Sequence, residues 1–240
     1  MQIIKARDYE DMSVKAAAYV LRHLKQNPAI NIGFATGGTP VGLYEQLVED
    51  HKKNQTSYQE VTSFNLDEYI GLSYDHPKSY HTYMREQLFE HIDIRDERVF
   101  IPESNIKEPE VACAAYEDAL YSHGGIDIQI LGIGSNGHIG FNEPGTDFQS
   151  TTHIVKLEET TRKANARFFN ILAEVPTHAI TMGIASIMRS KEILLLISGQ
   201  SKKDALHHLL HGEETEAVPA SILKRHPRVT VIADAAARGE

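Results

Sequence analysis

The sequence lacks several features that place a chain in a specialised class. Among its 240 residues there is one cysteine, Cys113, and no tryptophan. A single cysteine excludes an internal disulfide and a zinc site built mainly from thiolates. No apolar run is long enough to cross a bilayer, and residues 1–5 lead into an acidic stretch without the apolar centre of a signal peptide. We therefore expect a cytoplasmic protein without a membrane-spanning segment.

Positive charge is also scarce. The chain has 24 Lys and Arg residues against 33 Asp and Glu residues, which gives a formal net charge of −9. This balance argues against a general nucleic-acid-binding surface. An anionic ligand would need a few locally placed cations. Hydrophobic residues make up 41% and charged residues 24% of the chain, which is typical of a globular protein with a substantial core.

Short apolar runs alternate along the chain with longer stretches of helical spacing. This alternation predicts an α/β fold in which one doubly wound, mostly parallel sheet is covered by helices on both faces, a Rossmann-like arrangement. No linker or repeat divides the sequence, so we expect residues 1–240 to form a single domain. The expected strands lie near residue 3 and at 30–35, 61–66, 126–133, 179–182, 193–197 and 229–233. The expected helices are 8–26, 41–53, 80–91, 109–123, 158–173 and 202–211.

Ligands of open parallel sheets bind beyond the carboxyl ends of the strands, so the loops after the strands carry the candidate site. The second strand is followed by Thr36-Gly37-Gly38-Thr39-Pro40. Here Thr39 is a favourable helix N-cap, and Pro40 fits the first helical turn. The two glycines let backbone amides approach a ligand, and a helix N-terminus favours an anion such as phosphate. The spacing is not that of a P-loop or a dinucleotide site, and an ordinary turn explains it equally well.

Two further loops carry groups suited to acid–base chemistry. Asp67 and Glu68 follow the third strand, where a carboxylate could act as a general base. Acidic residues at the start of a turn or helix are nevertheless common, and this is the more frequent explanation of such a pair. The glycine-rich segment 132–145 contains Asn136, His138 and Glu143. A histidine in so flexible and polar a segment, with a carboxylate five residues later, favours a catalytic role over a structural one.

Two other clusters have ordinary explanations. His207 and His211 share a helical face, but no third ligand with suitable spacing is evident, so we expect no metal site. Tyr80, Tyr83 and Phe89 follow a helical spacing that is typical of core packing.

Taken together, segments 36–40, 64–69 and 137–144 resemble the glucosamine-6-phosphate deaminase family, in the same order and spacing and over nearly the whole chain. The resemblance implies an enzyme that converts glucosamine 6-phosphate and water into fructose 6-phosphate and ammonia, without a cofactor or a metal. Its partner is then a small amino sugar phosphate, with no nucleic acid and no membrane. The sequence leaves a homo-oligomer open.

The resemblance also implies roles for individual residues. It places the general base on Asp67 and the ring-opening histidine on His138, with Glu143 as the partner of the histidine. Many members have an aspartate at the position of Asn136, and an asparagine can orient the imidazole but cannot supply a charge. The phosphate contacts are implied at Thr36, Gly37, Gly38, Thr39, Arg167 and Lys202.

Other readings of the same residues stay open. Singly, Arg167 and Lys202 resemble ordinary cations on a helix surface. The related 6-phosphogluconolactonases share the fold and a Gly-His loop, but they usually lack the Phe-Asn-Glu-Pro continuation found at 141–144. A non-catalytic sensor domain of a transcription regulator would need a DNA-binding segment, which we expect at neither terminus. Longer family members carry an allosteric site for N-acetylglucosamine 6-phosphate; the matching stretch 151–155 is poor in cations, so we expect weak or absent activation.

Overall fold

A computed structural model describes residues 1–104, 108–166, 169 and 171–240 of the chain. Within these residues the centre of the fold is a sheet of seven strands, in the order β1-β10-β9-β6-β2-β3-β5. Every neighbouring pair in this sheet is parallel. The strands are β1 (Gln2–Lys5), β2 (Asn31–Phe34), β3 (Thr62–Asn65), β5 (Val99–Phe100), β6 (Ile128–Leu131), β9 (Glu192–Ile197) and β10 (Val229–Ala233).

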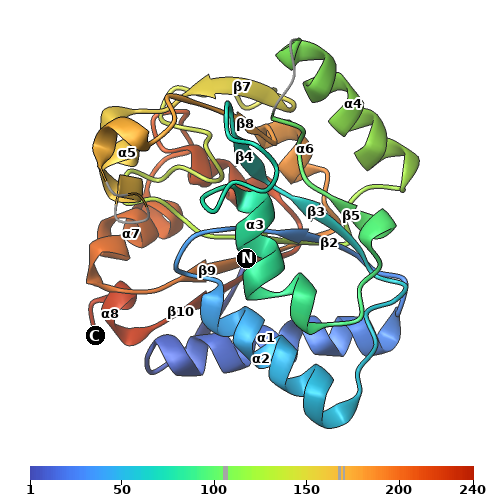
Figure 1. Cartoon of the computed structure of the whole chain (residues 1–240). Coiled ribbons are helices and arrows are strands. Elements are labelled where there is room, and N and C mark those ends of the chain that lie inside the picture. Colours follow the sequence, from blue (N-terminus) through green and yellow to red (C-terminus); the bar gives the residue numbers. More distant parts are fainter. Residues whose placement is uncertain (105–107, 167–168, 170) are drawn as a thin grey trace.

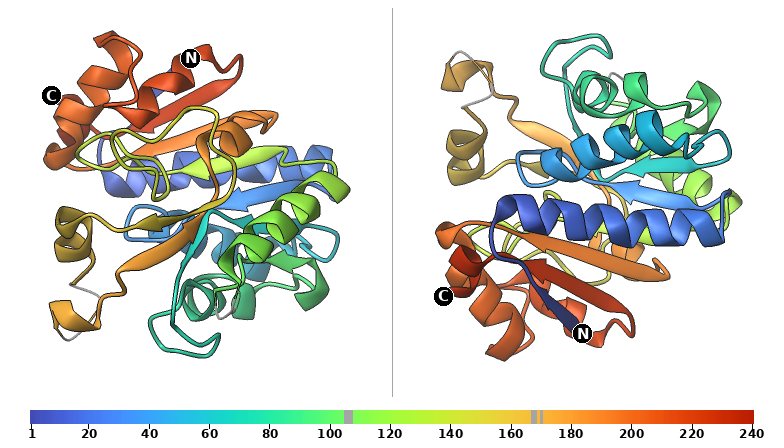
Figure 2. Two further views of the ribbon diagram at one scale, coloured as in Figure 1. Left: turned by 90° about the horizontal axis from the view of Figure 1, so that it is seen from above. Right: turned by 90° about the horizontal axis from the view of Figure 1, so that it is seen from below.

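Helices cover both faces of this sheet, which confirms the predicted fold class. In Figure 1, α1 (Tyr9–Gln26) and α2 (Val41–Asn54) lie side by side below the sheet, and α4 (Pro109–Ser122) and α6 (Ile184–Met188) lie above it. Figure 2 shows the molecule from above and from below. The other helices are α3 (Tyr80–Gln87), α5 (Glu159–Asn165), α7 (Lys203–His211) and α8 (Ala235–Arg238), with short 3-10 helices η1 (Phe89–His91), η2 (Asp96–Arg98), η4 (Leu172–Glu174), η5 (Gln200–Lys202) and η6 (Pro219–Arg225).

Local sequence explains the main elements. Helix α1 begins after Asp8, whose side chain accepts a hydrogen bond from the N–H of Asp11 at 2.8 Å, as an N-cap does. Its buried face includes Met12, Ala16 and Val20, which recur every four residues. Strands β9 and β10 consist almost entirely of buried apolar residues, as central parallel strands with both faces covered do. None of the helices in the described part of the chain has both the length and the apolar character that a membrane crossing requires.

A second, smaller sheet was not predicted. It contains β4 (Asp67–Tyr69), β8 (His178–Thr181) and β7 (His153–Lys156), paired antiparallel in that order. The run at 179–182 is therefore a strand, but it belongs to this sheet and not to the parallel one. Strands β4 and β7 are short and rich in polar residues, and β5 has two residues, so none of them produces an apolar run. The expected helices at 80–91 and 158–173 are also shorter, since α3 ends at Gln87 and α5 at Asn165.

The strand order creates a crevice beside β2 and β6. From β2 the chain continues to β3 and β5 on one side, and then returns to β6 on the other side before reaching β9 and β10. The loops that leave β2 and β6 therefore diverge at the carboxyl ends of two adjacent strands, which is where open α/β sheets bind ligands. These are the loops 35–40 and 132–140, so the topology brings two of the three predicted segments together.

Candidate active site

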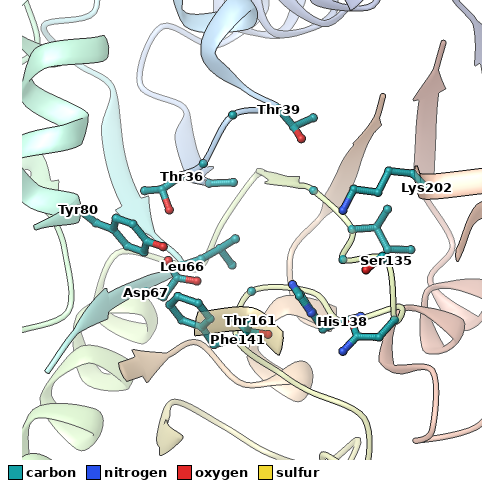
Figure 3. Close-up of a pocket in the computed structure, with 18 residues that line it drawn as sticks. Thr36, Thr39, Leu66, Asp67, Tyr80, Ser135, His138, Phe141, Thr161 and Lys202 are labelled. Carbon is teal, nitrogen blue, oxygen red and sulfur yellow. Dashed lines mark hydrogen bonds between the residues drawn. The ribbon is translucent and has the colours of Figure 1, made fainter. Parts of the chain in front are cut away.

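A cavity of about 350 Å³ opens at this crevice, and its size suits a small ligand (Figure 3). It joins most of the predicted site residues. Glu143 lies behind His138 and is not part of the wall, and Arg167 lies outside the described residues. The wall is formed by Ala35, Thr36, Gly37, Gly38, Thr39, Leu66, Asp67, Tyr80, Gly132, Ile133, Gly134, Ser135, Asn136, His138, Gly140, Phe141, Thr161 and Lys202.

The loop between β2 and α2 forms one end of the cavity. The prediction that Thr39 caps α2 is wrong, because the helix begins at Val41 and Pro40 takes the N-cap position without a side-chain hydrogen bond. The side chain of Thr39 is therefore not used for capping. Gly37 has a φ of 89°, a backbone conformation that residues other than glycine rarely adopt. The first turn of α2 has no acidic residue, so the positive end of the helix dipole is not neutralised locally.

Lys202 approaches this end of the cavity from the opposite side of the crevice. It is the last residue of η5 and precedes α7, after the buried strand β9. In Figure 3 its side chain extends toward Ser135 and the loop that carries Thr39. A helix N-terminus and an ammonium group at one end of a cavity make that end attractive to an anion such as a phosphate.

Asp67 and Glu68 have different surroundings because strand β4 alternates its side chains between two faces. The carboxylate of Glu68 accepts hydrogen bonds from the backbone N–H groups of Tyr69, Tyr80 and His81 at 2.7, 2.9 and 2.9 Å. It therefore fixes the start of α3. Asp67 lines the cavity and is 5% exposed. Burial, helped by the nearby charge of Glu68, raises the pKa of Asp67 to about 8.

A buried carboxylate lies behind the histidine of the glycine-rich loop. Glu143 Oε2 is 3.3 Å from Nδ1 of His138, which is within ion-pair distance. The same carboxylate accepts hydrogen bonds from Asn136 Nδ2 at 2.9 Å and from the hydroxyl of Thr161. Burial alone would raise the pKa of Glu143, but the contacts with His138, Thr161 and Asn136 lower it below its usual value. An ionised carboxylate thus faces Nδ1, and Nε2 is left to exchange protons with a ligand.

The ring of His138 packs directly on the backbone of Gly134. A Cβ atom added to this glycine would lie 2.3 Å from Cε1 of the imidazole. The two residues are also joined by a hydrogen bond from the N–H of Gly134 to the carbonyl of His138 at 2.9 Å. The glycine-rich sequence therefore allows the loop to fold over its own histidine and hold the ring at the cavity wall.

Sequence reasoning missed four polar or aromatic residues of the wall, Tyr80, Ser135, Phe141 and Thr161. Tyr80 was expected to be a core residue; instead it lines the cavity, where its ring is parallel to that of Phe141 with a centroid separation of 6.1 Å. Its hydroxyl donates to that of Tyr69 at 3.1 Å. Ser135 could have been found, because it lies within the glycine-rich loop. Thr161 and Tyr80 come from other elements, and no local pattern connects them to the site.

Comparison with known proteins gives a family match for the chain. The model of a family described as glucosamine-6-phosphate isomerases/6-phosphogluconolactonase matches residues 7–232. A glucosamine-6-phosphate deaminase of Halalkalibacterium halodurans is 58% identical over 234 residues, which cover 98% of this chain and 95% of the relative. Glucosamine-6-phosphate deaminase 1 of Bacillus subtilis is 50% identical over 234 residues, covering 98% of this chain and 97% of the relative.

Comparison with solved structures agrees with this family match. A monomeric glucosamine-6-phosphate deaminase superposes with a TM-score of 0.98 at 50% sequence identity, covering 100% of this chain and 99% of the other. A 6-phosphogluconolactonase of Trypanosoma brucei superposes with a TM-score of 0.81 at 20% identity, covering 99% and 97% of the two chains. At that identity the second match shows a shared fold and nothing about activity.

Proposed function

The chain belongs to the family of glucosamine-6-phosphate isomerases and 6-phosphogluconolactonases, and we propose that it is a glucosamine-6-phosphate deaminase. It converts glucosamine 6-phosphate and water into fructose 6-phosphate and ammonia. The observation that carries this choice within the family is that Asp67 and His138, from different loops, line one cavity. A lactonase only has to direct water at a carbonyl. An aldose–ketose isomerisation needs one group to open the ring and another to move a proton between carbons.

The phosphate is bound at the end of the cavity formed by the loop Thr36, Gly37, Gly38 and Thr39. Backbone N–H groups and the N-terminus of α2 attract it, and the ammonium of Lys202 faces it from the other side. We propose Arg167 as a further phosphate ligand on the strength of the family resemblance. Binding the phosphate, which does not react, provides the energy that positions the reacting carbons beside Asp67 and His138.

Ring opening is the task of His138. Its Nε2 delivers a proton to the ring oxygen as the bond between C1 and that oxygen breaks, and the proton lost by the C1 hydroxyl restores the imidazolium. The ionised carboxylate of Glu143, 3.3 Å from Nδ1, stabilises the charged ring. The product of this step is the open-chain aldehyde, in which the C2 hydrogen is acidified by the adjacent carbonyl and ammonium groups.

Asp67 then moves this hydrogen. The carboxylate removes the proton from C2, and the electron pair forms the C1–C2 double bond of an enolamine while the C1 oxygen gains a proton and the ammonium nitrogen loses one. The proton held by Asp67 then returns to C1, which leaves a protonated imine at C2. The resulting C2 imine takes up water, and the C2–N bond breaks to release ammonia and fructose 6-phosphate. A carboxyl group with its pKa raised by burial is a stronger base than an ordinary aspartate. The ammonium of the bound substrate favours its ionised form.

We propose that residues 1–240 form one catalytic domain and that a single chain suffices for activity. All the side chains that the mechanism uses belong to one chain, and the superposed deaminase is a monomeric protein. A homo-oligomer, if it forms, is then not needed for catalysis. The substrate is a metabolic sugar phosphate and the chain has one cysteine, which supports a cytoplasmic location.

We also propose that N-acetylglucosamine 6-phosphate does not activate the enzyme. The groove beside residues 151–154 is lined by Glu110 and Glu117, whose negative charges repel a phosphate. The side chain of Glu117 in addition accepts hydrogen bonds from the backbone and hydroxyl of Thr152 at 2.9 and 2.6 Å. A velocity curve that sharpens when this effector is added would contradict the proposal.

The decisive experiment is a coupled assay for ammonia and fructose 6-phosphate, run beside an assay for hydrolysis of 6-phosphogluconolactone. We expect both deamination products from the wild type and no significant lactone hydrolysis. Asp67→Asn keeps the size of the side chain and removes the base, so ammonia release should fall by about a thousandfold or more. Full activity of this variant would refute the assignment of Asp67, and lactone hydrolysis without ammonia would refute the function.

A further inference from the structure

Three tyrosine hydroxyls hold the backbone of the loop between β2 and α2. They come from three different helices, α1, α2 and α3, and each donates a hydrogen bond to a carbonyl oxygen of the loop. The three pairs are Tyr44 with Ala35, Tyr83 with Gly37 at 2.7 Å and Tyr9 with Gly38 at 3.1 Å. None of these tyrosines belongs to the wall of the cavity formed by the described residues, whereas all three carbonyl-bearing residues do.

Holding a carbonyl also fixes the direction of an N–H group. The peptide unit is planar, and in its trans form the C=O and the following N–H point in opposite directions. The peptide bonds of the described chain are all trans. Each tyrosine hydroxyl holds a loop carbonyl on the side of the helices. The N–H of the following residue is therefore turned toward the side of the cavity. The three N–H groups oriented in this way belong to Thr36, Gly38 and Thr39.

These N–H groups are available to a ligand. Within the described part of the chain, no backbone or side-chain acceptor takes a hydrogen bond from the N–H of Thr36, Gly38 or Thr39. Gly37, between them, has a φ of 89°, and a left-handed residue in such a loop lets neighbouring N–H groups converge on one point. Converging donors at the end of a cavity beside a helix N-terminus are suited to an anion with several oxygens.

We propose that the three hydroxyls act as a brace, the tyrosine brace, that aims three backbone N–H groups of the loop at the phosphate of the substrate. The brace thereby sets the affinity of the enzyme for the phosphate group. This inference rests on the proposed function for the identity of the anion, and it adds which residues outside the cavity determine how tightly the anion is held.

Two further observations support the tyrosine brace. Burial raises the pKa of Tyr44 and of Tyr83, so both hydroxyls remain protonated and can donate over the pH range in which the enzyme works. The hydroxyl of Tyr9 also accepts a hydrogen bond from the N–H of Gly42 at 2.8 Å, which ties the loop to the first turn of α2. Because the donors are oriented before the ligand arrives, binding needs little reorganisation of the loop.

The test uses the variants Tyr83→Phe and Tyr9→Phe, which remove one hydroxyl each, and inorganic phosphate as the probe. We expect each variant to raise the inhibition constant of phosphate and the KM for glucosamine 6-phosphate about three- to tenfold, since each loses one hydrogen bond that orients a donor. The kcat should stay within about twofold of the wild type. Tyr19→Phe is the matched control, because this α1 hydroxyl donates to Glu192 Oε2 at 2.6 Å, away from the loop.

The outcomes separate the brace from the proposed function. If the wild type releases ammonia and both variants keep its inhibition constant for phosphate, the brace is refuted. The same holds if kcat and phosphate affinity fall together with the melting temperature, because that pattern indicates a general loss of structure. If the wild type releases no ammonia, the proposed function fails, and calorimetric titration of the variants with inorganic phosphate still decides whether the tyrosines set phosphate affinity.

Discussion

The carboxylates of Asp67 and Glu68, adjacent residues of strand β4, lie on opposite faces of that strand. Glu68 accepts three backbone N–H groups and fixes the start of α3, whereas Asp67 lines the cavity. The carboxylate of Glu68 holds the wall of the cavity in place, and its charge helps burial to raise the pKa of Asp67. The two adjacent acids therefore have different roles: Glu68 is a structural group, and Asp67 is the group that we propose as the base.

The first prediction concerns the pH dependence of activity. Because the pKa of Asp67 is raised to about 8 in the free enzyme, we expect kcat/KM to increase with pH up to about 8. The substrate ammonium favours the ionised carboxylate, so the corresponding limb of the kcat profile should lie at lower pH. Steady-state rates between pH 5.5 and 9 at constant ionic strength test both statements. Two profiles with the same acidic limb would contradict the predicted effect of the ammonium.

The second prediction concerns stability. Burial raises the pKa of Asp67 from 3.8 to about 8, so between these values the unfolded chain releases a proton that the folded chain keeps. The contribution of this carboxyl group to the free energy of unfolding is therefore fully present below about pH 4. It is lost as the pH rises to 8, and the total loss is about 5 kcal/mol. Asp67→Asn should melt several degrees above the wild type at pH 8 and close to it at pH 4.5. Thermal melts at both values check this, and a difference that does not depend on pH would count against the buried, protonated carboxyl.

The third prediction uses the contact between Gly134 and His138. Gly134→Ala adds a methyl group 2.3 Å from Cε1 of the imidazole, so the ring must move. A small displacement of a catalytic group costs about a hundredfold in rate, and we expect kcat to fall by that order while KM changes little. The control is the same substitution in a His138→Ala background, where the ring is absent and the added methyl should have no further effect. Equal losses in both backgrounds would show that the methyl disturbs the loop and not the histidine.

The fold was largely predictable because its central strands are short runs of buried apolar residues between amphipathic helices. Strands such as β9 and β10 carry that signal in their own residues. The small antiparallel sheet does not, since β4 consists of Asp67, Glu68 and Tyr69 and becomes a strand only by pairing with β8. Local preference indicated a turn there, and tertiary contacts decided otherwise.

The site was predictable to the extent that its residues follow strand ends. Residues 36–39, Asp67 and His138 follow the carboxyl ends of β2, β3 and β6, and the parallel topology brings those strand ends together. Residues that reach the cavity from elsewhere had no such signal. Thr161 is on α5 and Tyr80 is on α3, and their places in the site depend on how these helices pack.

The fourth prediction concerns Thr161, whose hydroxyl donates to the buried carboxylate of Glu143. Thr161→Val keeps the shape of the side chain and leaves one carboxylate oxygen without a partner, so the carboxylate is held less firmly behind His138. We expect kcat to fall about tenfold with little change in KM, and Thr161→Ser to restore most of the activity. A Thr230→Val variant removes a buried hydroxyl from β10 as a control. If Thr161→Ser is as impaired as Thr161→Val, the hydroxyl is not what matters.

The fifth prediction concerns Asn136, at a position where the family resemblance implies an aspartate in many members. Asn136 Nδ2 donates to Glu143 Oε2 at 2.9 Å, so Asn136→Asp replaces a donor by a second carboxylate facing the first. One of the two acids must then have a raised pKa in the folded state, and the stability of the variant relative to the wild type should decrease as the pH rises above about 4. We expect a deficit of about 1–3 kcal/mol at pH 8 that shrinks toward pH 5, measured by urea denaturation. A constant difference would contradict this prediction, because it would mean that the imidazolium of His138 neutralises both carboxylates and neither acid needs a raised pKa.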